Sequence, residues 1–128
     1  MNIDLLKRIS ETPGVSGFES PIRELLKKQL SKYVDKCTTD KLGNLILFRK
    51  GKKNRKLMVA AHMDEIGFIV RHIDEQGFVR FLPLGGFDPK TLTAQRVVIH
   101  GKKDVVGVMG SKPVHLMKAD EKTKPVEM

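Results

Sequence analysis

Two residues in the middle of the chain have the types and the spacing to bind a metal ion. His62 and Asp64 lie two positions apart in the segment Ala60–Gly67 (AAHMDEIG). In an extended stretch, side chains two residues apart project to the same side. A histidine that binds a metal through one ring nitrogen needs an acceptor, often a carboxylate, at its other nitrogen. The pair can therefore supply a ligand and the carboxylate that orients it. The same residues also fit a polar turn with one solvated histidine. On the two residues by themselves, this simpler interpretation is favoured.

The other candidate residues carry weaker signals. His72 lies at the end of a predicted strand and His100 at a predicted hairpin turn. Histidines at such positions are usually hydrogen-bonded within the protein or exposed to solvent, and are seldom metal ligands. The segment Arg49–Lys56 carries six positive charges in eight residues, which could bind nucleic acid phosphates. The chain has only seven aromatic residues and no tryptophan, so few side chains are available for nucleic acid bases to stack on. A solvated hairpin tip is therefore the favoured interpretation of this segment.

Two helices are predicted in the first third of the chain. A short helix with its apolar face at Ile3 to Ile9 begins after Asn2, whose side chain suits an N-cap, and stops at residues 12–14 (TPG). A second helix begins with Ser20 as its N-cap and Pro21 at the first helical position, and its apolar stripe continues to Tyr33.

Strand patterns replace the helical period after residue 34. Two apolar runs, residues 44–48 and 56–61, flank the basic segment and predict a hairpin covered on one face by the second helix. Their apolar edges lack evident cover, which predicts association or poor solubility. From residue 66 onward only short strands and glycine-containing turns are found, and they suit a small barrel or sandwich. The strands are predicted in two hairpins, over residues 68–73, 78–82, 96–100 and 105–109.

Composition limits the class of protein. The chain of 128 residues is the size of one ordinary domain, and its character changes near Glu65, from α/β before to all-β after. Its net charge of +9 attracts phosphates or acidic surfaces. The single cysteine, Cys37, excludes an internal disulfide framework and suits a reducing compartment. No apolar run approaches the roughly 20 residues of a membrane helix, and the first ten residues do not resemble a signal peptide. We therefore expect a cytoplasmic protein.

Ordered motifs spread over nearly the whole chain resemble one family of metalloaminopeptidases. These are the glutamyl and deblocking aminopeptidases, which include tetrahedral particles and proteins historically labelled cellulases or endoglucanases. The longest matching motif is Met58–Phe68 (MVAAHMDEIGF). The others are PGVSGFE at 13–19, DKLGNL at 40–45, LGGFDP at 84–89, QRV at 95–97 and GSKPVHL at 110–116. Because these motifs occur in order, the resemblance is far more specific than any one of them.

The resemblance implies a fold and a mechanism. Residues 1–66 would begin a three-layer α/β/α catalytic domain, and residues 67–128 would be an incomplete, inserted, barrel-like β domain that mediates dimers. The dimers would build larger homo-oligomers, up to dodecamers in full-length members. Two divalent metal ions, zinc or cobalt, would hydrolyse the N-terminal bond of peptides with an activated water. His62 matches the family's first metal ligand, and Asp64 matches the carboxylate that orients it. For His115 two roles stay open, contact with a partner chain's active site or a structural role, and the structural role is favoured.

The chain also departs from the family, whose members are much longer. The bridging aspartate, the general-base glutamate and the remaining ligands would lie beyond these residues, so we expect an N-terminal fragment that is inactive by itself. Glu65 is not assigned as the general base, because that residue comes from a later segment in the family. Two alternatives stay open: a non-catalytic assembly module that keeps only the dimer-forming β segment, and, less favoured, a basic nucleic-acid-binding protein.

Overall fold

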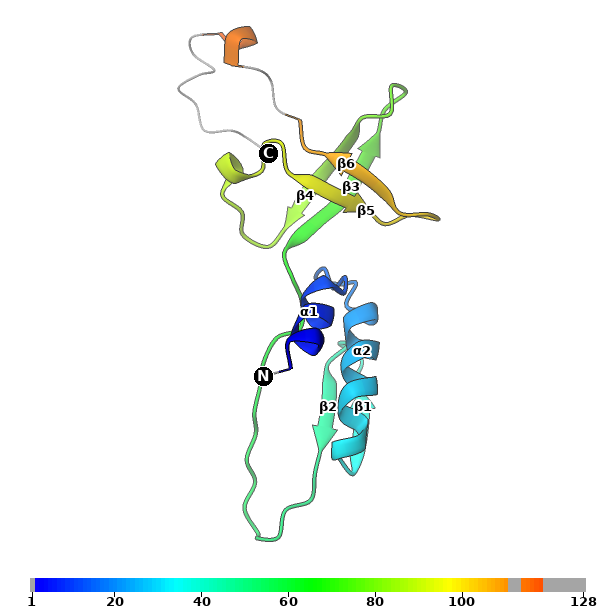
Figure 1. Ribbon diagram of the computed structural model, residues 1–128, viewed down its shortest axis with the longest axis vertical. Helices are drawn as coiled ribbons and strands as arrows, with labels where there is room; N and C mark the ends of the chain where they lie inside the picture. The colour runs from blue at the N-terminus through cyan, green and yellow to red at the C-terminus, as the bar shows by residue number, and fades with distance from the viewer. Residues whose placement is uncertain (1, 111–113, 119–128) are drawn as a thin grey trace. The chain divides into compact units, whose positions relative to one another are not determined.

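The computed structural model describes residues 2–110 and 114–118 (Figure 1). Contacts within the chain divide it into two compact units, of which the first ends at Phe68 and the second begins at Ile69. The described residues mix short helices with small two-stranded sheets, as the predicted α/β class requires. None of the helices in this part of the chain has the length and apolar character needed to cross a bilayer.

The first helix of the first unit confirms its prediction. Helix α1 (Ile3–Glu11) follows Asn2, whose side-chain oxygen accepts a hydrogen bond from the Leu5 backbone N–H at 3.1 Å. This bond satisfies one of the N–H groups that the first turn of a helix leaves free. The helix ends just before the Thr12–Gly14 segment, where proline and glycine interrupt the helical pattern.

The second helix begins one residue earlier than predicted. Helix α2 spans Ser20–Leu30, and Glu19 occupies the N-cap position without a side-chain capping bond. The prediction of Ser20 as the N-cap was therefore wrong. Because Ser20 is already helical, its hydroxyl faces the next turn and accepts a hydrogen bond from Arg23 Nη2 at 3.0 Å. The predicted continuation to Tyr33 is a 3₁₀ turn, η1 (Ser31–Tyr33), rather than α-helix.

Helix α2 packs beside an antiparallel pair of strands (Figure 1). Strand β1 (Lys36–Thr39) pairs with β2 (Leu45–Phe48), with Lys36 opposite Phe48 and Thr39 opposite Leu45. The core of this unit centres on Ile22 of α2, which is 3% exposed. Ile22 lies so close to Gly14 that an added Cβ there would come within 2.6 Å of its Cγ2 atom.

The predicted hairpin between residues 44–48 and 56–61 is wrong. Residues 56–61 form no strand, and β2 pairs with β1 instead. The five-residue turn Asp40–Asn44 closes the β1–β2 pair locally, whereas the run at 56–61 has no neighbouring strand within the described residues. The basic segment Arg49–Lys56 is consequently a long exposed loop and not a hairpin tip. The apolar residues after it are almost fully exposed, at 91% for Leu57 and 88% for Met58.

The second unit consists of two hairpins, as predicted. One joins β3 to β4 and the other joins β5 to β6, and each forms its own two-stranded sheet. Closure of the strands into a barrel stays a prediction. The elements are β3 (Gly67–Ile73), β4 (Val79–Leu84), η2 (Pro89–Thr91), β5 (Arg96–Ile99), β6 (Val105–Val108) and η3 (Val114–Leu116). Met109, which is 7% exposed, is buried just after β6 and exchanges two backbone hydrogen bonds with the turn before β5.

Candidate functional site

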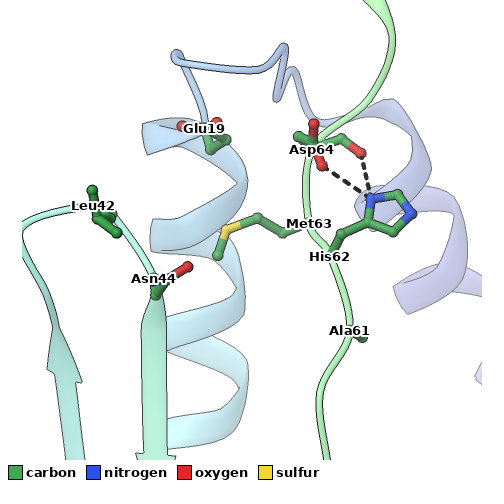
Figure 2. A pocket seen from close by; sticks show the side chains of 8 residues that line it. Glu19, Leu42, Asn44, Ala61, His62, Met63 and Asp64 are labelled. Carbon is green, nitrogen blue, oxygen red and sulfur yellow. Dashed lines mark hydrogen bonds and ion pairs between the residues drawn. The ribbon is translucent and has the colours of Figure 1, made fainter. Parts of the chain in front are cut away.

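His62 and Asp64 contact each other on the extended segment that leads to β3 (Figure 2). The Nδ1 atom of His62 lies 3.0 Å from Asp64 Oδ1 and 3.0 Å from the Asp64 backbone oxygen. Because a carbonyl oxygen only accepts, these contacts require Nδ1 to carry the proton. In the neutral imidazole the other ring nitrogen, Nε2, then keeps its lone pair. With 85% of the His62 side chain exposed, that nitrogen is open to a ligand.

The residue after this pair fixes the segment to the loop that follows α1. Glu65 donates its backbone N–H to the Gly14 oxygen at 2.9 Å, and the Glu65 carboxylate accepts the Gly14 N–H at 3.0 Å. Val15 and Glu65 also form an isolated parallel bridge. The carboxylate of Glu65 is thus occupied with a backbone N–H, which agrees with leaving it out of the catalytic assignment.

His62 and Asp64 line a small pocket of about 140 Å³ within the first unit (Figure 2). Its walls come from three places: the start of α2, the turn between β1 and β2, and the segment that carries the histidine. The lining residues are Glu19, Leu42, Gly43, Asn44, Ala61, His62, Met63 and Asp64. The first two walls contribute residues that the sequence left without a functional role.

The turn between β1 and β2 is built around one carboxylate. Asp40 Oδ1 accepts the backbone N–H groups of Leu42 at 3.0 Å and Asn44 at 2.9 Å, while Oδ2 accepts the Asn44 side-chain Nδ2 at 2.9 Å. These hydrogen bonds, first the one from the Asn44 side chain, lower the pKa of Asp40 below its ordinary value. The turn is therefore ordered by its own residues.

Arg23 ties this turn to α2. Its Nη1 atom donates to the Gly43 oxygen at 2.7 Å. Gly43 has a φ of +89°, a left-handed conformation that favours glycine. A Cβ at this position would also lie 2.6 Å from Arg23 Nη1. Two walls of the pocket are thus held together by a contact at which any side chain on residue 43 would be strained and would displace the Arg23 guanidinium.

Glu19 adds a negative charge to the rim. Its carboxylate accepts the Gly17 backbone N–H at 2.6 Å. This bond is the main reason that the pKa of Glu19 falls below its ordinary value, with help from its own N–H and from the charge of Arg23. Slight burial and the charge of Asp64 act in the opposite direction. Glu19 is consequently ionised at neutral pH.

The described residues supply one histidine at this pocket. Among them, no group of three or more histidine, cysteine, aspartate or glutamate side chains is arranged to hold a metal ion. His72, on β3, and His115, in η3, belong to the second unit and are exposed. His100 also lies there, where its Nδ1 atom contacts Asp104 Oδ1 at 2.9 Å across the β5–β6 turn. A histidine whose Nδ1 contacts a carboxylate, as in His62, has the arrangement that is usual for one imidazole ligand of a metal site.

Comparison with known proteins identifies the family. The family model of the M42 glutamyl aminopeptidases matches residues 43–128, which is two thirds of the chain. The chain belongs to this family. The resemblance found in the sequence motifs is thereby confirmed.

Individual relatives agree with the assignment to the M42 family. The putative aminopeptidase FrvX of Escherichia coli is 41% identical over 128 residues, covering 98% of this chain and 36% of that protein. A TET aminopeptidase structure from a marine sediment archaeon of the Thaumarchaeota superposes with a TM-score of 0.90 at 37% identity, over 98% of this chain and 35% of that one. The TET1 peptidase of Pyrococcus horikoshii, which can assemble into a tetrahedron or an octahedral shell, superposes with a TM-score of 0.80 at 33% identity, over 98% and 37%. The chain spans about a third of the length of these relatives.

Sequence reasoning missed Glu19 and Asn44 as lining residues of the pocket, and Arg23 as the side chain that joins two of its walls. A signal was present, because Glu19 closes the PGVSGFE motif and Asn44 lies in the DKLGNL motif. Both motifs were used only as sequence matches to the family, and no functional role was assigned to their residues. The fold brings residues of both motifs into the lining of one pocket, and in Figure 2 Glu19 and Asn44 lie on the same side of the His62 segment.

Proposed function

We propose that this chain carries the first part of the active site of a metal-dependent aminopeptidase, which removes N-terminal residues from peptides. The observation that carries the proposal is the contact of His62 Nδ1 with Asp64 Oδ1 at 3.0 Å. It turns Nε2 outward, where the neutral imidazole offers a lone pair, in a chain that belongs to a family of aminopeptidases. Imidazole with a carboxylate behind it is a usual ligand for catalytic metals.

The two residues have distinct roles in this proposal. His62 is a metal ligand through Nε2, and Asp64 is a positioning residue that fixes the tautomer and the ring orientation of His62. When bound, a pair of zinc or cobalt ions supplies a Lewis acid for the scissile carbonyl and activates water for attack. A catalytic zinc usually has three protein ligands, and the described residues supply one. We therefore expect the isolated 128-residue chain to be inactive.

The two parts of the chain have different tasks. Residues 1–66 begin the catalytic domain, and residues 67–128 belong to a β domain through which copies dimerise and build larger homo-oligomers. Support comes from the assembly described for the Pyrococcus horikoshii relative and from the exposed apolar side chains of β6, such as Val106 at 70%. His115 has a structural role in that domain. The single cysteine, Cys37, is unpaired, which supports a cytoplasmic location.

Hydrolysis of a leucyl chromogenic amide tests the function. The isolated 128-residue chain is expected to release no product with zinc or cobalt. The full-length protein, meaning one that contains these residues together with the rest of the catalytic domain, is expected to hydrolyse the amide. There His62→Ala should lower the rate by at least about 100-fold, because a ligand is lost, whereas His100→Ala removes a histidine outside the pocket and should change it little.

Each alternative result has a definite meaning. A full-length protein that is inactive with both metals would overturn the aminopeptidase proposal. Activity of the isolated chain that disappears in His62→Ala would show that copies of the chain complete the site for one another, and the expectation of an inactive fragment would be wrong.

A further inference from the structure

The basic loop, Arg49–Lys56, carries six positive charges and no negative one. Every residue in it is exposed. Within the part of the chain that the structure describes, none of its side chains forms an ion pair. Like charges held this close repel one another, and a partner with several negative charges removes that repulsion. The loop is therefore suited to bind an extended anion rather than a single acidic side chain.

The fold adds further positive charge beside the basic loop. Lys36, on β1, lies directly opposite Phe48 of β2. Both side chains are therefore on one face of the sheet, next to the point where the loop leaves β2 (Figure 1). The acidic residue beside Lys36 is already engaged, because the Asp35 carboxylate accepts the Lys50 backbone N–H at 2.6 Å. One end of the first unit is thus strongly basic.

Two exposed aromatic side chains lie at the same end of the first unit. Phe48, the last residue of β2, is 54% exposed, and Tyr33, in η1, is 59% exposed. A backbone hydrogen bond links their segments, since the Asp35 N–H donates to the Phe48 oxygen at 2.9 Å. The basic loop itself contains no aromatic residue, so this supply becomes visible only in the folded chain. Aromatic rings beside cationic side chains are the combination that binds single-stranded nucleic acids.

We propose that the basic loop, together with Tyr33 and Phe48, binds a single-stranded nucleic acid. The cations of the loop contact the phosphates and the two rings stack on bases, so binding depends strongly on salt and little on base sequence. An acidic polypeptide would neutralise the same charges but has no bases for the rings. The inference is independent of the proposed aminopeptidase function, because none of these residues lines the His62 pocket.

The test is the fluorescence anisotropy of a labelled oligo-dT of about 15 nucleotides, titrated with the full-length protein. Joint replacement of Lys52, Lys53 and Arg55 by Gln should weaken binding at least about tenfold at roughly 0.1 M salt. The slope of the logarithm of the binding constant against the logarithm of the salt concentration should also become less steep by about 2. Each phosphate contact of a single strand contributes about 0.7 to that slope.

The matched control removes the same charge from exposed positions elsewhere in the chain. Joint replacement of Lys7, Lys102 and Lys103 by Gln should change the affinity by less than about twofold, because these side chains lie outside the basic end. Stacking is tested separately. Tyr33→Ala should weaken binding about fivefold or more, whereas Tyr33→Phe keeps the ring and should bind like the wild type.

Three results would overturn the inference. Equal losses in the two triple variants would show that the net charge alone attracts the oligonucleotide. A poly-glutamate peptide with as many negative charges that binds as tightly as oligo-dT would identify an acidic polypeptide as the partner. Unchanged affinity in Tyr33→Ala would mean that no base stacks on this ring. Because peptidase activity has no part in these measurements, each result leaves the aminopeptidase proposal as it stands.

Discussion

At the scale of single residues, the chain contains two histidine–aspartate contacts of nearly equal length. His62 meets Asp64 at 3.0 Å and His100 meets Asp104 at 2.9 Å. They differ in their surroundings: the first pair lines a pocket, and the second lies on a hairpin turn. The geometry of one contact therefore does not make a site. The walls that Glu19 and the Asp40–Asn44 turn place beside His62 distinguish the first pair from the second.

The clamp between Arg23 and Gly43 can be tested by glycine substitution. Gly43→Ala is expected to lower the free energy of unfolding by about 2–3 kcal/mol, because it combines left-handed backbone strain with displacement of the Arg23 hydrogen bond. Gly17→Ala is the matched control. Gly17 has a φ of +85°, and an added Cβ there meets no atom within 4 Å. This control should cost only the strain, about 1 kcal/mol, in urea denaturation. Equal losses in the two variants would contradict a role for the clamp.

At the scale of secondary structure, the sequence predicts elements whose determinants are local. Helix α1 with its Asn2 cap follows from nearby residues, as do the two hairpins of the second unit. In the first of these hairpins, Asp74 Oδ1 accepts the N–H groups of Gln76 and Phe78. The pairing of residues 56–61 was not predictable in this way. An apolar run indicates a segment suited to a strand, but not which strand will lie beside it. Here β2 pairs with β1 and not with residues 56–61.

The same reasoning explains what could be predicted of the site. The spacing of His62 and Asp64 predicted side chains on one side of an extended segment, and the contact at 3.0 Å agrees. The walls of the pocket depend on how α2 and the β1–β2 turn pack against that segment. Such contacts join residues about 20 to 40 positions apart, as the bond from Arg23 to Gly43 illustrates. No local pattern in the sequence specifies them.

One buried side chain packs helix α2 against the loop that follows α1. Ile22 is 3% exposed and packs against Gly14. Ile22→Ala should therefore reduce the free energy of unfolding by about 2–4 kcal/mol, the usual cost of an emptied core position. Ile3→Ala truncates an isoleucine that is 68% exposed and should stay within about 0.5 kcal/mol of the wild type. Chemical denaturation of the two variants measures the difference, and similar effects would mean that Ile22 is not the anchor of α2.

At the scale of the whole molecule, the described residues bury few apolar side chains and expose many. Only Ile22 and Met109 are buried apolar residues among them, whereas Leu57, Met58 and Val59 are 87–91% exposed. Contiguous apolar surface of this kind favours association. The 128-residue chain is accordingly expected to be associated in solution.

Light scattering at low salt tests this expectation. The isolated chain should show a mass well above its 14.4 kDa, and Met58→Lys should reduce that mass because it places a charge within the apolar segment. Asn54→Lys adds the same charge to the neighbouring basic loop and should leave the mass unchanged. A monodisperse monomer of the unaltered chain would contradict the prediction.

The central claim is that Asp64 holds His62 as a metal ligand, and zinc affinity measures it most directly. In the full-length protein, Asp64→Asn keeps an acceptor of similar shape but removes the negative charge behind the imidazole. Zinc affinity, measured by competition with a chelator, should fall about 10- to 100-fold. Asp104→Asn makes the same change in the pair on the β5–β6 turn and should leave the affinity unaltered. Equal affinities in the wild type and Asp64→Asn, or equal losses in both variants, would contradict the account.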